Sequence, residues 1–133
     1  MYDSNLQNLD ISILFNNVSY AEGGKFSELS TNQIHTMMTI NCFTMTLLTK
    51  CVLESFKRRH KGSTAKSLII NHCAAASIAP MPYVQVYSAT KVFCDFMTEG
   101  LNYELKEFGV DVMGIRSFGI TANQDYWMNV THQ

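Results

Sequence analysis

Ser67-Leu68-Ile69-Ile70-Asn71 is a short apolar run between two segments of helical periodicity, and it decides the fold. Its length and its β-branched residues are typical of a buried strand. The small residues Ala74-Ala75-Ala76 follow, and Pro80 and Pro82 then stop regular structure. The sequence therefore predicts a strand that ends in a loop before the second helical segment.

On the N-terminal side of this strand, the sequence predicts a long amphipathic helix that begins at Ser30. Ser30 and Gln33 have the spacing of a capping box. The residues that recur at intervals of three to four after this cap are Ile34, Met37, Met38, Asn41, Met45, Leu48, Val52 and Phe56. Earlier still, residues 11–15 form another β-rich run, which the polar pair Asn16-Asn17 ends, so a first strand is expected there.

On the C-terminal side, a second helix is expected to begin near Val86. Its apolar residues keep the helical period up to Gly109, which is a helix stop. The run Val110-Asp111-Val112-Met113-Gly114-Ile115 then predicts a third strand.

Alternating strands and helices with connections of this length predict an α/β fold with parallel strands. Two right-handed crossovers in one direction place both helices on the same face of the three-stranded sheet. Parallel sheets normally need cover on both faces, and neither residues 1–10 nor 117–133 are clearly apolar enough to supply it. The chain is therefore expected to be part of a domain, with a protein partner over the bare sheet face.

Composition excludes several classes of function. The chain has 133 residues and a formal net charge of -1, without the basic face that nucleic acid needs. The basic run at residues 57–61 is expected to be a solvated helix end. The cysteines and histidines form no CxxC, HxxxH or HExxH pattern, so no metal site is expected. The absence of a signal pattern and of a run of 18 apolar residues predicts an intracellular protein without a membrane span.

One motif and its context indicate a family. Tyr87-Ser88-Ala89-Thr90-Lys91 places a phenol and an ammonium on one face of a helix start. Before it come Asn16-Asn17-Val18-Ser19 after the first strand, and Asn41 within the first helix. In this order, these residues resemble the YxxxK, NNAG and active-site Asn positions of the short-chain dehydrogenase/reductase family. The resemblance extends over about residues 9–123 and is strongest to the hydroxysteroid dehydrogenase and 3-ketoacyl-CoA reductase branch, around Val52-Leu53 and Pro80-x-Pro82.

The resemblance implies a Rossmann-like sheet, an NADP(H)-type cofactor and a role for each matched residue. Tyr87 is the expected general acid or base, which requires a pKa well below about 10. Lys91 is expected to lower that pKa and to hold the nicotinamide ribose, while Asn41 holds a water in the proton relay. Asn16 and Thr121 lie in segments that approach the nicotinamide half in relatives. A Tyr and a Lys one turn apart are also ordinary features of structural helices.

The sequence departs from the family at two places that matter for chemistry. Thirteen residues before Tyr87, where relatives have a substrate-orienting Ser, this chain has Ala74. The neighbours Cys73 and Ser77 are out of register. The sequence also contains no TGxxxGxG turn, which cradles the cofactor's pyrophosphate, and Ser19 replaces the Gly of the NNAG turn. Residues 1–133 are therefore expected to form a truncated domain that does not bind NADP(H) alone.

Three functional hypotheses follow. The preferred one is a remnant or a subunit derived from an NAD(P)-dependent oxidoreductase and inactive by itself. The alternative is a portion of an active hydroxysteroid dehydrogenase or 3-ketoacyl-CoA reductase, which the retention of Tyr87, Lys91 and Asn41 favours. The third is a docking module, because the helices 31–60 and 86–108 form the dimer interface in relatives. Under each of the three hypotheses, a partner is expected to cover the apolar edge of the strand at 11–15.

Overall fold

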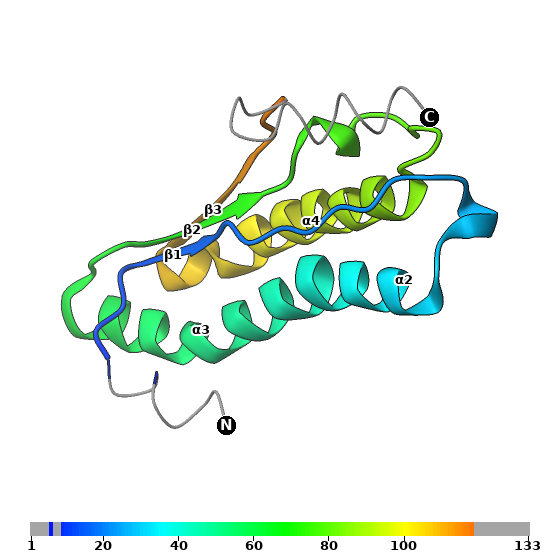
Figure 1. Cartoon of the computed structure of the whole chain (residues 1–133). Coiled ribbons are helices and arrows are strands. Elements are labelled where there is room, and N and C mark those ends of the chain that lie inside the picture. Colours follow the sequence, from blue (N-terminus) through cyan, green and yellow to red (C-terminus); the bar gives the residue numbers. More distant parts are fainter. Residues whose placement is uncertain (1–5, 7–8, 119–133) are drawn as a thin grey trace.

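The chain forms a three-stranded parallel sheet with its helices packed on one side (Figure 1). The computed structural model describes residues 6 and 9–118. The strands are β1 (Ile13–Asn16), β2 (Ser67–His72) and β3 (Val110–Ile115), in the order β1-β2-β3. All neighbouring pairs are parallel. The three predicted strands and the α/β class are thus confirmed, and β3 has the predicted bounds.

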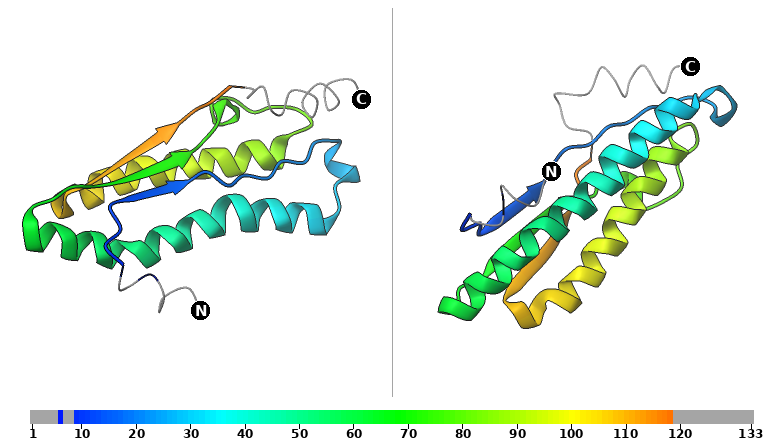
Figure 2. Two further views of the ribbon diagram at one scale, coloured as in Figure 1. Left: turned by 60° about the vertical axis from the view of Figure 1, so that its left-hand side comes forward. Right: turned by 90° about the horizontal axis from the view of Figure 1, so that it is seen from below.

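Two long helical rods connect the strands. The first comprises α2 (Thr31–Met38), a π-helical turn (Thr39–Phe43) and α3 (Thr44–Ser63). The second comprises α4 (Gln85–Glu104) and a 3-10 turn (Leu105–Phe108). The view from below in Figure 2 shows both rods in front of the strands, so they cover the same face of the sheet. The placement predicted from crossover handedness is confirmed.

The ends of the rods follow the expected capping chemistry. The Gln33 amide donates to Ser30 Oγ at 3.2 Å, and the Ser30 amide donates to Gln33 Oε1 at 2.8 Å, which completes the capping box. Gly109 ends the second rod with φ +67°, and a Cβ at that position would overlap the ring of His60. Glycine is therefore required there both by the backbone conformation and by the close approach of α3.

The core fills the space between the sheet and the two rods. Its fully or nearly fully buried members come from α3, β2, β3 and the 3-10 turn: Val52, Phe56, Ile69, Leu105, Val110 and Val112. Ile69 and Val112 are register partners in adjacent strands and point to the helix side. This burial of apolar area is the main force that holds the layers together.

The opposite face of the sheet is apolar and open to solvent. Phe15, Ile70 and Met113 form one row across the three strands, and Phe15 and Met113 are 53% and 48% exposed. Within residues 6 and 9–118 no helix covers this face (Figure 2). A partner for this face and for the free edge of β1 stays a prediction.

The first rod, Thr31–Ser63, is long and apolar enough to cross a membrane by length and composition. This is weak evidence, because the core helix of a soluble protein passes the same test. Here the rod supplies the buried side chains of Met37, Met45 and Phe56 to the interior. The absence of a membrane span and the intracellular location therefore stay predictions from the sequence.

Candidate active site

Tyr87 and Lys91 lie one turn apart at the beginning of α4, and both are buried, with 5% and 2% exposure. The i, i+4 spacing brings them to one helix face, and the Lys91 Nζ lies 5.5 Å from the centre of the Tyr87 ring. Lys91 Nζ also donates a hydrogen bond of 2.8 Å to the carbonyl oxygen of His72 at the end of β2. The helix start is thus fixed to the carboxyl end of the central strand, which is where α/β sheets bind ligands.

Burial shifts the pKa of both groups toward their neutral forms. Desolvation raises the pKa of Tyr87, a hydrogen bond with the Ser19 side chain opposes this, and Cys94 adds to the rise. Desolvation also lowers the pKa of Lys91, against the raising influence of Cys94, Cys73, Cys42 and Asp95. The role implied by the resemblance requires a lowered phenol pKa, so the described surroundings have the opposite effect.

Asn41 lies in the π-helical turn between α2 and α3, and its amide is fully engaged. Its Nδ2 donates to the Tyr20 carbonyl oxygen at 2.8 Å and to Thr90 Oγ1 at 2.9 Å. Its Oδ1 accepts from the Tyr20 amide at 2.8 Å. The π-turn, a feature frequent at functional sites, aims the side chain between the loop after β1 and α4. Asn41 thus connects the loop at Tyr20 to the helix that carries Tyr87 and Lys91.

Ala74 occupies a strained backbone position directly after β2. Its φ and ψ are 75° and 153°, a combination that residues other than glycine adopt only at a cost of about 1–3 kcal/mol. Its methyl side chain has no hydrogen-bond donor. Cys73 does not substitute for one, since its Sγ is turned into the interior, 3.2 Å from Cys94 Sγ. The Ser77 hydroxyl donates to the Ala74 carbonyl oxygen at 2.9 Å.

Asn16 belongs to a polar network on the helix side of the sheet. Its Nδ2 donates to Asn71 Oδ1 at 2.8 Å and to Thr49 Oγ1 at 3.3 Å. Asn71 is fully buried and donates to Thr98 Oγ1 at 2.9 Å. Asn71 was not predicted to be a neighbour of the site, although its position at the end of an apolar strand, like that of Asn16, is a sequence signal for such a role.

The residues present fit only one half of a nicotinamide cofactor. Lys91 has two N–H groups besides the one given to His72, and beside the Tyr87 phenol these suit a ribose hydroxyl pair. The Oδ1 of Asn16 is buried without a partner in the described part of the chain and can accept one hydrogen bond. The sequence offers no TGxxxGxG cradle for the pyrophosphate. Thr121 lies outside the described residues.

Comparison with known proteins identifies the family of this arrangement. The family model described as short chain dehydrogenase matches residues 3–130. The very-long-chain 3-oxoacyl-CoA reductase of Neurospora crassa is 34% identical over 119 residues, covering 88% of this chain and 34% of that protein. The enzyme of the same name from Rattus norvegicus is 34% identical over 121 residues, with 88% and 37% covered. The chain thus spans about a third of the length of these curated relatives.

Solved structures give the same result. A bulky-bulky ketone specific alcohol dehydrogenase from Comamonas testosteroni superposes with a TM-score of 0.78 at 28% identity, covering 86% of this chain and 45% of that one. A short-chain dehydrogenase from Sphingobium yanoikuyae in complex with NADPH gives 0.76 at 29% identity, with 85% and 43% covered. The chain belongs to the short-chain dehydrogenase/reductase family, on the branch of the 3-oxoacyl-CoA reductases.

Proposed function

We propose that this chain is a remnant or a subunit derived from the catalytic half of a 3-oxoacyl-CoA-type reductase and that these 133 residues do not turn over substrate alone. The observation that carries the proposal is the buried pair Tyr87 and Lys91 at the carboxyl end of β2, beside an alanine at the position of the substrate-orienting serine. The proton-transfer residues are present, but the donor that orients the carbonyl is not.

The chemistry assigned to the chain's own residues is proton transfer. Lys91 and the Tyr87 phenol would hold the nicotinamide ribose of NADP(H), and this cofactor would supply the hydride for the carbonyl carbon. The Tyr87 hydroxyl gives its proton to the carbonyl oxygen, which becomes a hydroxyl group. The Lys91 ammonium, held at 2.8 Å from the His72 carbonyl, stabilises the phenolate that remains. Asn41 orients this region by fixing the loop at Tyr20 against Thr90.

Two features support inactivity of the chain by itself. Loss of one hydrogen-bond donor to a developing oxyanion typically lowers kcat by about 100- to 1000-fold, and Ala74 has no donor in its side chain. In addition, burial raises the pKa of Tyr87, and a phenol with a raised pKa is a weaker acid. Carbonyl activation and proton transfer are therefore both impaired.

The test is an assay of the purified 133-residue protein with NADPH and a long-chain 3-oxoacyl-CoA. We expect no NADPH oxidation above the rate with enzyme omitted, and measurable turnover would overturn the proposal. A second arm joins the N-terminal segment of the Rattus norvegicus relative to this chain, with and without Ala74→Ser. Activity only with the serine would assign the defect to residue 74. Activity of both forms would assign it to the cofactor half.

A second candidate function is an active reductase of which this chain is one portion. The retained arrangement of Tyr87, Lys91 and Asn41 favours an active reductase, because a chain that does not catalyse the reaction needs none of these three side chains for proton transfer. A fused or co-expressed cofactor half that restores turnover with Ala74 unchanged would establish this candidate. The same result would exclude the remnant hypothesis.

We also propose that another polypeptide chain covers two surfaces of this protein. The first is the apolar sheet face around Phe15 and Met113, together with the edge of β1. The second is the outer side of the helix pair, where Phe43, Leu47 and Phe96 are 60%, 54% and 77% exposed. Exposed apolar area of this kind is typical of interaction surfaces. The occupant proposed for the helix pair is a second copy of this chain.

A further inference from the structure

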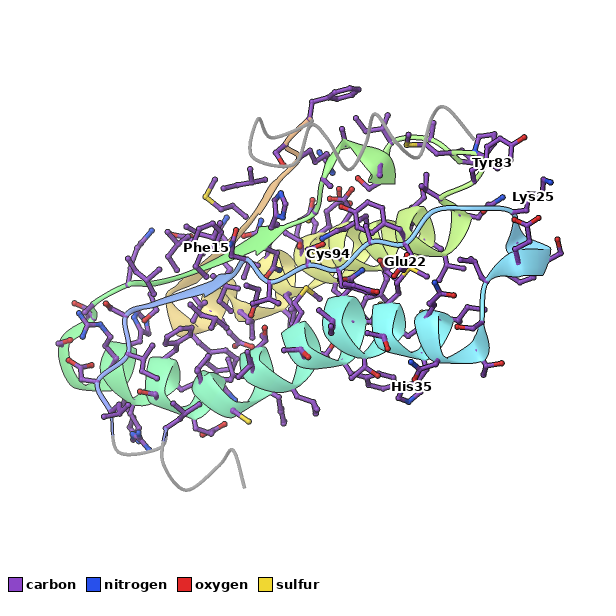
Figure 3. The ribbon with its side chains drawn as sticks, in the orientation of Figure 1. Phe15, Glu22, Lys25, His35, Tyr83 and Cys94 are labelled. Carbon is purple, nitrogen blue, oxygen red and sulfur yellow. The ribbon has the colours of Figure 1, made fainter. Side chains whose placement is uncertain are left out.

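Three buried sulfur atoms lie together between β2 and α4, one turn past Lys91 on the helix. Cys73 Sγ and Cys94 Sγ are 3.2 Å apart, and Cys94 Sγ is 3.4 Å from Met45 Sδ. Cys73 is fully buried and Cys94 is 3% exposed. Figure 3 labels Cys94 on α4. A disulfide has a sulfur separation of about 2.0 Å, so the two sulfur atoms must approach one another further to form the bond.

The hydrogen bond that the two thiols share affects their acidity in opposite directions. The hydrogen bond from Cys73 lowers the pKa of Cys94, burial opposes this, and the Lys91 ammonium adds to the lowering. The same hydrogen bond, together with burial, raises the pKa of Cys73. The Thr98 hydroxyl is a further polar neighbour, 3.7 Å from Cys73 Sγ. Cys94 is therefore the more readily ionised thiol of the two, and thiolates react with oxidants faster than thiols do.

The surface of β3 lies close to one member of this pair. Gly114 is exposed, and a Cβ at its position would lie 3.0 Å from Cys73 Sγ. Gly114 also lines a surface pocket together with Asp95, Thr98 and Arg116. Thr98 Cγ2 and Asp95 Oδ1 lie 3.5 Å and 3.6 Å from the same position, so Cys73 Sγ packs close to the residues that line the pocket.

We propose that Cys73 and Cys94 form a reversible disulfide when the protein meets hydrogen peroxide. The Cys94 thiolate attacks one peroxide oxygen, the O–O bond breaks, and hydroxide leaves and takes up a proton to become water. The resulting Cys94 sulfenic acid is attacked by the Cys73 sulfur. The S–S bond forms, the S–OH bond breaks, and the departing hydroxide takes the Cys73 proton as a second water.

This modification site is independent of the proposed function, since it requires no cofactor and no substrate. Its position gives it a consequence for the candidate site nonetheless. The new bond would fix α4 to the end of β2. On α4 it would start from Cys94, three residues beyond Lys91, and it would end at Cys73, which directly precedes Ala74. It would therefore lock the contact between Lys91 Nζ and the His72 carbonyl.

The experiment treats the reduced 133-residue chain with hydrogen peroxide and blocks the remaining thiols with N-ethylmaleimide. Trypsin cleaves after Lys50, Lys66, Lys91 and Lys106, so Cys73 and Cys94 fall on separate peptides, 67–91 and 92–106. We expect these peptides to be joined, with an intact mass about 2 Da lower than that of the reduced chain. The reductant dithiothreitol should reverse both changes. Oxidation should also raise the unfolding midpoint by about 5–10 °C.

Matched variants separate this pair from the other thiols. The double variant Cys42→Ser, Cys51→Ser should give the same linked peptides at the same rate. Cys73→Ser and Cys94→Ser should each abolish them. Three results would each overturn the proposal. They are oxygen addition to Cys94 without a disulfide, a disulfide from Cys94 to Cys42, and a loss of 2 Da in the variant Cys73→Ser. The peptide map of the unsubstituted chain decides the matter even if a variant fails to fold.

Discussion

The Lys91 ammonium lies 5.5 Å from the centre of the Tyr87 ring, and both side chains are buried at the start of α4. Burial raises the pKa of the phenol and lowers the pKa of the amine. The surroundings therefore favour a neutral phenol and weaken the charge on its neighbour. A hydrogen-bond donor to the phenol oxygen would lower the pKa of Tyr87, and a hydrogen-bond acceptor at the ammonium would raise the pKa of Lys91.

Lys91 should give the protein a stability that rises with pH. Because its pKa is lowered on folding, the unfolded chain binds more protons than the folded chain between the folded pKa and the ordinary lysine pKa of 10.5. The penalty for the buried charge is complete below the folded pKa and disappears above the unfolded one. Urea unfolding between pH 7 and pH 10 should therefore show a rising free energy of unfolding.

The variant Lys91→Met isolates this contribution, since it keeps the aliphatic volume and removes the titrating group. Its stability should rise less over the same pH range than that of the unsubstituted protein. Lys66→Met is the control, because Lys66 is exposed at the surface. Parallel pH profiles for the unsubstituted protein and Lys91→Met would contradict the argument.

Ala74→Gly should stabilise the fold. The φ of 75° at Ala74 costs about 1–3 kcal/mol, whereas glycine adopts it freely at an entropic cost of about 0.5–1 kcal/mol. The expected net gain in the free energy of unfolding is about 1 kcal/mol, measured by urea denaturation. Ala75→Gly, one residue later in a 3-10 turn, is the matched control and should destabilise. Equal losses in both variants would show that residue 74 is not strained.

Asn41→Ala should release the loop at Tyr20. The substitution removes two hydrogen bonds to the Tyr20 backbone and one to Thr90, which leaves partly buried polar groups without partners. We expect a loss of about 2–3 kcal/mol in the free energy of unfolding. Hydrogen exchange should become faster at Tyr20. Asn41→Asp is the matched control, because it keeps the acceptor for the Tyr20 amide. Unchanged hydrogen exchange at that amide in Asn41→Ala would refute the connection between Asn41 and the loop at Tyr20.

Phe96→Lys should weaken any self-association through the helix pair. Phe96 is 77% exposed on α4, and a charge there opposes burial against a second copy. Light scattering of the purified chain should show a dimer that the substitution converts to a monomer. Ile78→Lys, on the loop after β2 with 72% exposure, is the control and should remain dimeric. A monomer in the unsubstituted protein would remove the basis for this interface.

Local sequence signals determined the elements of this fold. The apolar run at 67–71 predicted β2, the Ser30 and Gln33 pair predicted a capping box, and Gly109 predicted the end of the second rod. Crossover handedness then placed both helices on one face. These predictions were confirmed because hydrophobic periodicity, helix caps and crossover handedness depend on residues that are near one another in the sequence. The family could also be recognised from Tyr87, Lys91 and Asn41, whose order is preserved along the chain.

Only the tertiary structure decided what those residues experience. Burial raises the pKa of Tyr87, where the resemblance implied a lowered value, and the neighbours that also affect this pKa include Ser19, which is far from Tyr87 in the sequence. The proximity of Cys73 to Cys94 and the pairing of Asn16 with Asn71 likewise join residues far apart in sequence. The φ of Ala74 follows from its place between β2 and a 3-10 turn, since alanine itself disfavours that conformation. Such features come from packing, which no local pattern encodes.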